Sequence, residues 1–206
     1  SAGIARLYSA HDLKIYLNYA LNQASFIPQS QLTEQHGIIE MPARAMKRIM
    51  LEKFIATDKA QVINNKLKWH KHTGWIEVTI GLLERQGKIR AFNPSLTVAL
   101  GNVLTLEEKF QGGTGINITP PPAPFVRPAA VKAARDKAEI VAQCLSLNGY
   151  ARLDAFMNIK NGELIIIEVN TLPGLTPATV IFHQALAENP PLYPKEFLEK
   201  IVGNNY

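Results

Sequence analysis

The stretch from Arg152 to Asn170, "RLDAFMNIKNGELIIIEVN", carries the residue types best suited to chemistry in this chain. It combines an arginine, two carboxylates and an amide, namely Arg152, Asp154, Glu168 and Asn170. Hard oxygen ligands of this kind suit Mg²⁺, which commonly takes one or two carboxylates together with phosphates and water. The stretch therefore predicts a magnesium site, and the alternative is an exposed patch of charged residues on a sheet.

The same stretch predicts a β-hairpin, and the turn decides whether the two carboxylates meet. Side chains alternate between the two faces of a strand. A two-residue turn at 161–162 pairs Asp154 with Val169 and leaves Glu168 on the opposite face. A three-residue loop at 160–162 pairs Asp154 directly with Glu168. Only the second arrangement brings the carboxylates together.

Two features favour the longer loop. Three-residue hairpin loops commonly end in a left-handed residue, and Gly162 suits that position. The same loop also places Arg152 opposite Asn170. Because the run 165–167 is entirely isoleucine, we expect both faces of the second strand to be buried, where an unpaired carboxylate is costly. We predict this loop, or an equivalent bulge.

Composition limits the class of protein. The 206 residues are 47% hydrophobic, which suits one globular domain or two small lobes. With 19% charged and 8% aromatic residues, global disorder is excluded. The net charge of +5 fits an anionic ligand or ordinary surface variation. The absence of a Lys/Arg block interleaved with aromatics argues against nucleic acid as a partner.

Membrane and disulfide classes are also disfavoured. No apolar run approaches the ~20 residues that span a bilayer, so we predict no membrane partner. Residues 1–25 lack the pattern of a signal peptide. The single cysteine, Cys144, excludes an internal disulfide and a multi-cysteine zinc site. These features predict a cytoplasmic protein.

The elements that must position these residues follow one another in a mixed order of helices, strands and loops. Ser9 is a candidate N-cap with an acid at Asp12, so a helix is expected there. We then expect a loop or insertion at 26–48, a buried strand at 48–55 and a protruding hairpin at 56–74. The His70 and His72 pair in that last segment has no evident third ligand, so a surface hairpin is favoured over a metal site.

The second half of the chain is expected to follow the same mixed order. We expect a strand at 75–84, a tight turn at Gln86-Gly87 into 88–92, a strand at 102–110 and a mobile loop at 111–124. A long helix should then open at Pro128, with Gly149 as its C′ residue. The hairpin follows it, and after the hairpin come helices near 179–188 and 194–202. Strands, helices and antiparallel hairpins in this order predict an α+β fold.

Several motifs together resemble a known family. The segments "GYARLDAF" and "IIIEVNTLPGLTPATV" closely resemble the C-terminal signature of D-alanine–D-alanine ligases, which belong to the ATP-grasp superfamily. Further matches follow in the family's order: "SAGI" resembles the phosphate loop, "LEKFI" the adenine hinge, "IEVTIGLL" the ribose-binding strand and "EEKF" the closing loop. The resemblance covers most of the chain except 26–48 and 56–74.

The resemblance implies roles for the hairpin residues. Asp154, Glu168 and Asn170 would hold two magnesium ions, with manganese as the alternative metal. Arg152 would stabilise the oxyanion that forms during amine attack, and the backbone N–H of Gly174 would assist it. For Gly174 the alternative is a simple turn.

The resemblance also implies a nucleotide site. The adenine hinge would consist of Glu52, Lys53, Phe54 and Ile55. Glu77 would bind the ribose hydroxyls, and Phe156 and Ile167 would enclose the base, with plain core packing as the alternative for both. Together these residues would make ATP the cosubstrate.

Four residues match substrate-contacting positions. Lys109 would contact the γ-phosphate, or else form a surface ion pair with neighbouring glutamates. Thr179 and Val180 would hold the carboxylate of the second amino acid, although Thr179 also suits a helix N-cap. Phe110 stands where many of these ligases have tyrosine. In related ligases a phenylalanine there accompanies a hydroxy-acid acceptor.

The implied fold is a partial ATP-grasp fold with antiparallel sheets and packed helices in two lobes. Residues 1–78 would form the remainder of the small lobe, with insertions at 26–48 and 56–74, and 79–206 would form the catalytic lobe. The portion that binds the first D-alanine is missing, so the chain resembles a fragment. We predict that the isolated chain is inactive or nearly so.

The resemblance implies ATP-dependent ligation of two D-alanines through an acyl phosphate, for peptidoglycan precursor synthesis. The partners would be ATP, D-alanine or a similar small amino or hydroxy acid, and the N-terminal portion of the parent protein. One alternative is an ATP-grasp ligase that makes another dipeptide or a D-alanyl-D-lactate-type ester. Another is a non-catalytic nucleotide-binding module.

Overall fold

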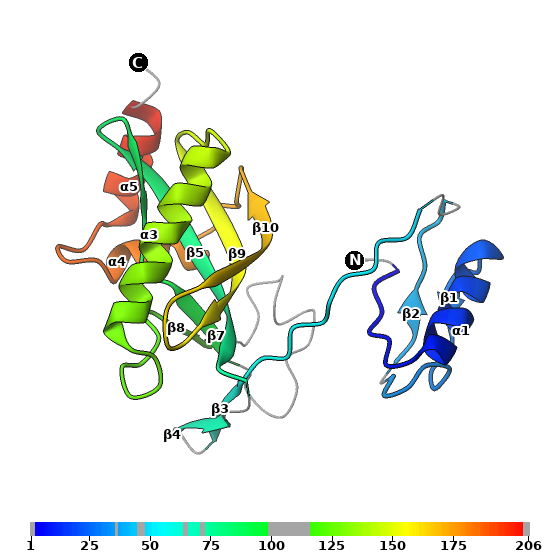
Figure 1. Cartoon of the computed structure of the whole chain (residues 1–206). Helices are drawn as coiled ribbons and strands as arrows, with labels where there is room; N and C mark the ends of the chain where they lie inside the picture. Colours follow the sequence, from blue (N-terminus) through cyan, green and yellow to red (C-terminus); the bar gives the residue numbers. More distant parts are fainter. Residues whose placement is uncertain are drawn as a thin grey trace. The chain divides into compact units, whose positions relative to one another are not determined.

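The computed structural model of the chain describes residues 3–35, 37–44, 48–63, 66–70, 73–98 and 116–203. It divides into two compact units, Ser1–Phe54 and Ile55–Tyr206 (Figure 1). The lobe boundary expected between residues 78 and 79 falls inside a long strand of the second unit, and the division into lobes stays a prediction. Among the described residues, no helix has the length and apolar character needed to cross a bilayer.

The first unit consists of one helix and two short strands. They are α1 (Ala10–Leu21), β1 (Phe26–Ile27) and β2 (Ile39–Glu40), and the strands pair antiparallel. The predicted start of α1 is confirmed, because the Ser9 side chain accepts the N–H of Asp12. Tyr16 and Ala20 bury one face of α1 against the core of this unit. Segment 26–48, expected to be a loop, therefore also contributes two short strands.

Asp12 is a buried carboxylate in this unit. Its Oδ1 accepts hydrogen bonds from the backbone N–H of Thr33 at 3.1 Å and from the Thr33 hydroxyl at 2.9 Å, and its Oδ2 accepts the N–H of Tyr8 at 2.8 Å. The Thr33 and Tyr8 amides lower the pKa of Asp12 from 3.8 to about 2. The ionised side chain therefore ties the start of α1 to the loop that follows β1.

The expectation of a buried strand at 48–55 is wrong. This segment forms no strand, and Met50, Leu51 and Phe54 are exposed. The apolar residue types suggested a core strand, but no neighbouring strand pairs with the segment. It joins the two compact units.

The second unit is built on a six-stranded sheet that is antiparallel throughout its described pairs. Its strands are β5 (Trp75–Arg85), β6 (Lys88–Ala91), β7 (Ser95–Val98), β8 (Ile116–Ile118), β9 (Tyr150–Asn158) and β10 (Leu164–Asn170). Their order is β10-β9-β5-β7-β8, with β6 also paired to β5 (Figure 1). The long pairing of β5 with β9 places the predicted hairpin beside the predicted ribose-binding strand.

Helix α3 (Pro128–Cys144) covers one face of the sheet. Its alanines at 130, 134, 138 and 142 are buried in the core that the helix shares with β5 and β9. The prediction of Gly149 as its C′ residue is wrong. The helix ends at the C-cap Leu145, and Ser146 adopts the positive φ of 52°. Gly149 has a positive φ of its own, in the turn that leads into β9.

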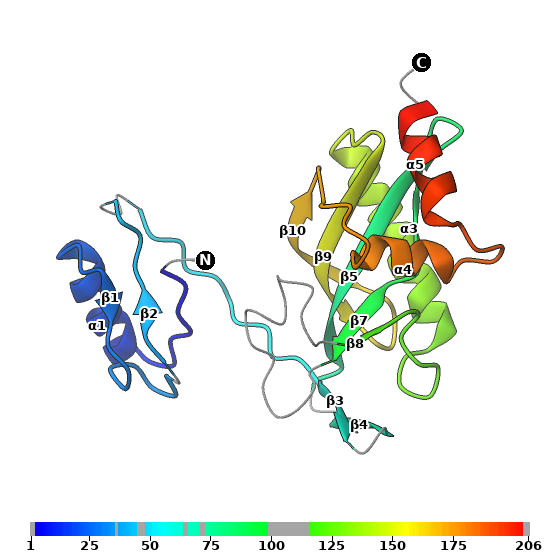
Figure 2. The same cartoon turned by 180° about the vertical axis from the view of Figure 1, so that it is seen from behind.

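Two short helices follow β10 on the other side of the sheet. They are α4 (Val180–Leu186) and α5 (Pro194–Gly203), close to their predicted ranges. Figure 2 shows both in front of the sheet while α3 lies behind it. Phe182 and Phe197 pack edge to face, with ring centroids 5.4 Å apart, and join the two helices.

The hairpin expected at 56–74 is confirmed as β3 (Lys59–Ile63) and β4 (Lys66–His70). Trp69 stacks on Phe125, with ring centroids 4.9 Å apart, so the hairpin also contributes to the core of the unit. The loop expected at 111–124 contains a strand at 116–118, which extends the sheet beyond β7. The strand predicted at 102–110 lies outside the described residues.

Candidate active site

The candidate site lies on the face of the sheet opposite α3, on the part that α4 and α5 do not cover, which is called the uncovered face (Figure 2). Along β9, residues 151, 153, 155 and 157 are buried against the core, while Arg152, Asp154 and Phe156 point the other way and are half-buried. The same alternation on β5 places Glu77 and Thr79 on the uncovered face. The period of two along each strand therefore collects the polar residues on one surface.

The register between β9 and β10 confirms that Asp154 pairs with Glu168 and Arg152 with Asn170. The expected three-residue loop is not how this happens. Next to the turn, Leu164 pairs with Met157. If this register continued regularly along the strands, Asp154 would lie opposite residue 167. A β-bulge between residues 166 and 168 shifts the register by one residue. The alternative that we had expected, an equivalent bulge, is therefore correct.

The turn itself is longer than predicted. The N–H of Asn158 donates to the carbonyl of Glu163 at 2.9 Å, so residues 159–162 form the loop. Gly162 has the predicted left-handed conformation, with φ of 65°. A Cβ there would lie 2.2 Å from the carbonyl oxygen of Ala130, so glycine is needed where the turn meets α3.

The expectation that both faces of β10 are buried is wrong. Leu164, Ile166 and Val169 pack against the core, whereas Ile167 is 46% exposed on the uncovered face. Because Ile167 occupies the bulge, it and Glu168 point to the same side of the sheet. The candidate carboxylates thus lie beside an exposed apolar side chain.

The four polar residues of the hairpin contact one another. Arg152 Nη2 donates to Asp154 Oδ2 at 2.9 Å and lies 3.9 Å from Glu168 Oε1. Asn170 Nδ2 donates to Asp154 Oδ2 at 3.3 Å and to Glu168 Oε1 at 3.1 Å. The side chain of Asp154 is 16% exposed and that of Glu168 is 54% exposed. One carboxylate is therefore held in the sheet, and the other faces solvent.

Thr79 is a member of this cluster that the sequence analysis missed. It lies opposite Asp154 on β5, and its hydroxyl donates to Asp154 Oδ1 at 2.8 Å. The signal was present, because Thr79 is two residues beyond Glu77 in the predicted strand and therefore on the same face. Without the β5–β9 register, nothing distinguished it from an ordinary strand threonine.

The donor set fits a hard divalent cation. Asp154, Glu168 and Asn170 supply two carboxylates and an amide, a combination that suits Mg²⁺. The described residues contain no cluster of three or more His, Cys, Asp or Glu side chains. Asn170 directs its nitrogen at the carboxylates, and its amide must rotate to offer oxygen instead.

The predicted ribose and base residues lie together on the same surface. Glu77 is the direct cross-strand partner of Phe156. Ile167 is exposed on β10, on the other side of β9. A row from Glu77 through Phe156 to its β10 partner Ile165 therefore crosses this surface, and the bulge residue Ile167 lies between this row and the carboxylates.

The four residues expected to form the adenine hinge are divided between the two units. Glu52, Lys53 and Phe54 belong to the first unit, and Ile55 begins the second. Within the first unit, the Arg6 guanidinium lies 3.6 Å from the centre of the Phe54 ring. This cation–π contact fixes one end of the hinge segment.

The residues expected to meet the second substrate follow β10. Gly174 is exposed, and a Cβ added to it would meet no atom of the described chain within 4 Å. Thr179 occupies the N-cap position of α4, but its side chain makes no capping hydrogen bond. Val180 is half-buried as the first residue of α4. Lys109 and Phe110 lie outside the described residues.

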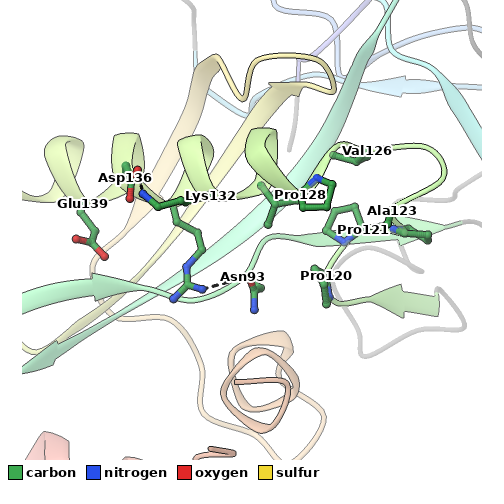
Figure 3. Close-up of a pocket in the computed structure, with 12 residues that line it drawn as sticks. Asn93, Pro120, Pro121, Ala123, Val126, Pro128, Lys132, Asp136 and Glu139 are labelled. Atoms are coloured by element: carbon green, nitrogen blue, oxygen red, sulfur yellow. Dashed lines mark hydrogen bonds and ion pairs between the residues drawn. The ribbon is translucent and has the colours of Figure 1, made fainter. Parts of the chain in front are cut away.

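A separate pocket of about 530 Å³ lies along α3 and contains none of the predicted site residues (Figure 3). Its walls include Pro120, Pro121 and Pro128, and its charged residues include Lys132 and Asp136, which form an ion pair at 2.7 Å. The charges around this pocket are matched within the chain.

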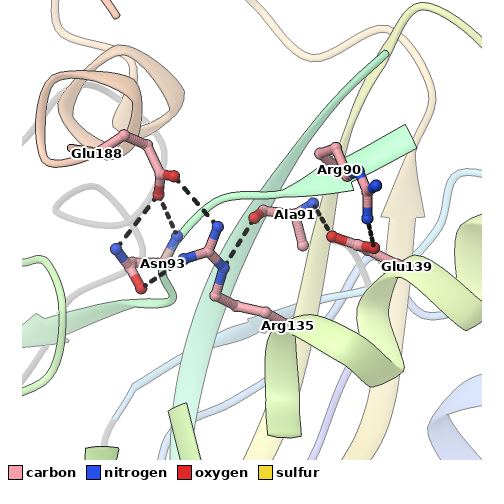
Figure 4. A network of polar contacts seen from close by, with 6 residues as sticks. All are labelled: Arg90, Ala91, Asn93, Arg135, Glu139 and Glu188. Carbon is pink, nitrogen blue, oxygen red and sulfur yellow. Dashed lines mark hydrogen bonds and ion pairs between the residues drawn. The ribbon is translucent and has the colours of Figure 1, made fainter. Parts of the chain in front are cut away.

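The network beside this pocket has a structural role (Figure 4). Arg135 donates to the carbonyl of Ala91 at 3.0 Å and to Glu188 Oε2 at 3.1 Å. Glu139 accepts the N–H of Ala91 at 3.1 Å and pairs with Arg90 at 3.1 Å. These contacts tie α3 to the end of β6 and to the residues after α4.

Comparisons with known proteins place the chain in a family. D-alanine–D-alanine ligase of Leptospira interrogans is 35% identical over 116 residues, which cover 54% of this chain and 32% of that protein. The D-alanine–D-alanine ligase of Leptospira biflexa is 30% identical over 146 residues, which cover 69% of this chain and 40% of that protein. The chain thus spans roughly a third of these relatives.

The fold is also similar to a solved structure. D-alanyl-alanine synthetase A from Vibrio cholerae superposes with a TM-score of 0.50 at 21% identity, over 67% of this chain and 40% of that one. The α+β, ATP-grasp-like architecture expected from the sequence is therefore confirmed. The family model described as "D-ala D-ala ligase C-terminus" matches residues 36–202. The chain belongs to the D-ala D-ala ligase C-terminus family.

Proposed function

We propose that this chain is the C-terminal part of a longer enzyme that joins two D-alanine molecules at the expense of ATP, for peptidoglycan precursor synthesis. The observation that carries the proposal is the convergence of Arg152, Asp154, Glu168 and Asn170 on one uncovered face of the sheet. Family membership and relatives named D-alanine–D-alanine ligase support it.

In this proposal the hairpin holds the metal and the phosphates. Asp154 and Glu168 would hold one magnesium ion, and Glu168 and Asn170 a second. Magnesium, when bound, offsets the negative charge of the phosphoryl group during its transfer. Thr79 holds one oxygen of Asp154 through its hydroxyl, which leaves the other oxygen to Arg152 and Asn170.

The nucleotide would lie along the row beside the carboxylates. Phe156 and Ile167 offer apolar surface for the base, and the carboxylate of Glu77 can accept hydrogen bonds from ribose hydroxyls. The backbone of residues 52–55 would pair with the adenine edge, with Lys53 near its ring nitrogen. Lys109 would contact the γ-phosphate.

The proposed reaction has two steps. The carboxylate of the first D-alanine takes the γ-phosphoryl group from ATP, and the amine of the second D-alanine then displaces phosphate. Arg152 carries a permanent charge and would stabilise the oxyanion of that second step, assisted by the Gly174 N–H. Thr179 has a hydroxyl that the helix does not use, and with Val180 it would hold the second carboxylate.

The test is ATP-dependent product formation by the longer protein that carries this chain. We expect phosphate release that requires Mg²⁺ and D-alanine, with D-alanyl-D-alanine identified by mass spectrometry. Phosphate release without dipeptide would contradict the proposal. For the 206-residue chain alone we expect little or no turnover, and robust phosphate release by it would contradict that part.

The same assay separates the alternatives. Phe110 motivates an assay with D-lactate in competition with D-alanine, because a hydroxy-acid acceptor would yield an ester in place of a dipeptide. Exclusive dipeptide formation would rule out that ester. Binding of ATP and Mg²⁺ without turnover in the longer protein would instead identify a nucleotide-binding module.

A further inference from the structure

Strand β5 has a gap in its ladder at Ile80 and Gly81. On one edge β5 pairs with β6 as far as Leu82 and with β7 from Thr79. The chain that connects β6 to β7 leaves the sheet between these pairs. It still contributes one hydrogen bond there, because the N–H of Phe92 donates to the Gly81 carbonyl at 2.9 Å. Backbone groups of β5 at this gap need other partners, because a buried, unpaired peptide group is costly.

The carboxamide of Gln184 fills this gap. Its Oε1 accepts the N–H of Gly81 at 2.8 Å, and its Nε2 donates to the carbonyl of Thr79 at 2.7 Å. Gln184 is 0% exposed and lies on α4. One side chain therefore takes the place of a neighbouring peptide group, and it links a helix to a strand through both of its polar atoms.

Gly81 makes room for this link. A Cβ at residue 81 would lie 2.6 Å from Gln184 Oε1 and 2.7 Å from Ile181 Cγ1. Because residues 79 and 81 of a strand point to the same face, α4 approaches the sheet on the face that carries the Thr79–Asp154 contact. Figure 2 shows α4 on this side of the sheet.

Gln184 thus stands between two parts of the proposed reaction centre. Toward β5, it holds the backbone of Thr79, whose hydroxyl fixes Asp154. It also anchors its own helix, α4, which begins directly after the N-cap residue Thr179. The sequence alone indicates no role for Gln184, because a glutamine on a short helix carries no signal of its own.

We propose that Gln184 is a positioning residue that sets α4, and with it Thr179 and Val180, at a fixed distance from the metal-binding carboxylates. This inference rests on the proposed ligase function. Gln184 itself touches no substrate. It acts by holding the site for the second amino acid against the strand that supports the phosphate site.

The first experiment compares Gln184→Leu with Phe182→Leu in the longer protein. Leucine keeps the apolar bulk of Gln184 but removes both hydrogen bonds to β5. Phe182→Leu loosens the packing of the same helix against α5 and leaves the carboxamide link intact. Misplacement of a substrate group by about 1 Å can cost up to about 100-fold, so we expect Gln184→Leu to raise the KM for the second D-alanine on the order of ten-fold.

The second experiment tests the same link from β5. Gly81→Ala places a methyl group against Gln184 and Ile181 and should push α4 away while every polar side chain stays in place. Gly203→Ala is the matched control, because a Cβ there meets nothing within 4 Å. Gly81→Ala decides the question if Gln184→Leu shows no cooperative thermal unfolding.

The result expected is a split between substrates. Both test variants should raise the KM for the second D-alanine by more than they raise the KM for ATP. Each control protein should keep both KM values within about two-fold of the parent. The positioning role alone would be overturned if the test variants raised the KM for the second D-alanine no more than a control with an equal loss of Tm. It would also be overturned if they changed only the KM for ATP. A parent protein without D-alanine-dependent turnover would overturn the proposed function and this inference together.

Discussion

Asp154 and Glu168 are direct partners across β9 and β10, and the extra residue at the bulge makes them so. In the register that starts at the turn, Glu168 would stand opposite Leu153 and point into the core against α3. The bulge at Ile167 shifts Glu168 by one position and returns it to the uncovered face. A single inserted residue therefore determines whether this hairpin has two carboxylates together.

The metal ligands can be tested by removing charge without changing shape. Asp154→Asn and Glu168→Gln in the longer protein should each lower Mg²⁺-dependent ATP affinity by on the order of 100-fold or more, because even outer partners of metal ligands cost about 10–100-fold. Titration calorimetry with and without Mg²⁺ measures this. Asp136→Asn, on the exposed side of α3, is the control and should leave affinity unchanged. Equal losses in the control would refute the assignment.

Thr79 should matter through its hydroxyl. Thr79→Val removes the donor to Asp154 Oδ1 and keeps the side-chain volume, whereas Thr79→Ser keeps the donor. We expect the valine variant to bind Mg²⁺ about 10-fold more weakly in the presence of ATP, and the serine variant to stay close to the parent. Calorimetric Mg²⁺ titrations give both values. Equal affinities for the two variants would show that the hydroxyl does not hold the metal ligand.

Ile167 should contribute to nucleotide binding and not to the metal site. Truncation to alanine removes exposed apolar surface from the face that carries Phe156. We expect the Kd for ATP to rise roughly ten-fold at saturating Mg²⁺, because the base would cover about two of the three carbons that are lost, at ~0.8 kcal/mol each. Fluorescence titration with an ATP analogue measures the change. Ile140→Ala, on the exposed face of α3, serves as the comparison. A weaker Mg²⁺ requirement in Ile167→Ala would contradict the separation of roles.

Asp12 should make the first unit acid-sensitive. Its pKa is lowered from 3.8 in the unfolded chain to about 2 in the folded chain, by the amides of Thr33 and Tyr8. The stabilisation is therefore complete above pH 3.8 and is lost as the pH falls through about 2. Asp12→Asn lacks the carboxylate and should destabilise the unit at neutral pH.

Hydrogen exchange of the α1 amides measures this effect within the first unit. At neutral pH the Asp12→Asn protein should exchange faster than the parent. The difference should shrink as the pH approaches 2, because protonation removes the same acceptor from the parent. A difference that does not depend on pH would show that the ionised carboxylate is not the stabilising form.

Local patterns made much of this fold predictable. The N-cap Ser9, the proline that opens α3 and the tight turn after β5 each depend on short-range geometry, and each lies where the sequence indicated. The absence of a strand at 48–55 could not be predicted in this way. The apolar residues of this segment match a core strand, but whether such a segment is buried depends on a pairing partner elsewhere in the chain, and none pairs with it.

The sequence by itself determined which residues form the candidate site. Carboxylates, an amide and an arginine at alternating positions specify their chemistry, and they place Arg152 with Asp154 on one face of the first strand and Glu168 with Asn170 on one face of the second. Only the tertiary structure decided how they meet, because the bulge at Ile167, the hydroxyl of Thr79 and the carboxamide of Gln184 all depend on contacts between distant strands and helices. Such contacts depend on strand register and on packing between elements, and neither can be read from the sequence around a single residue.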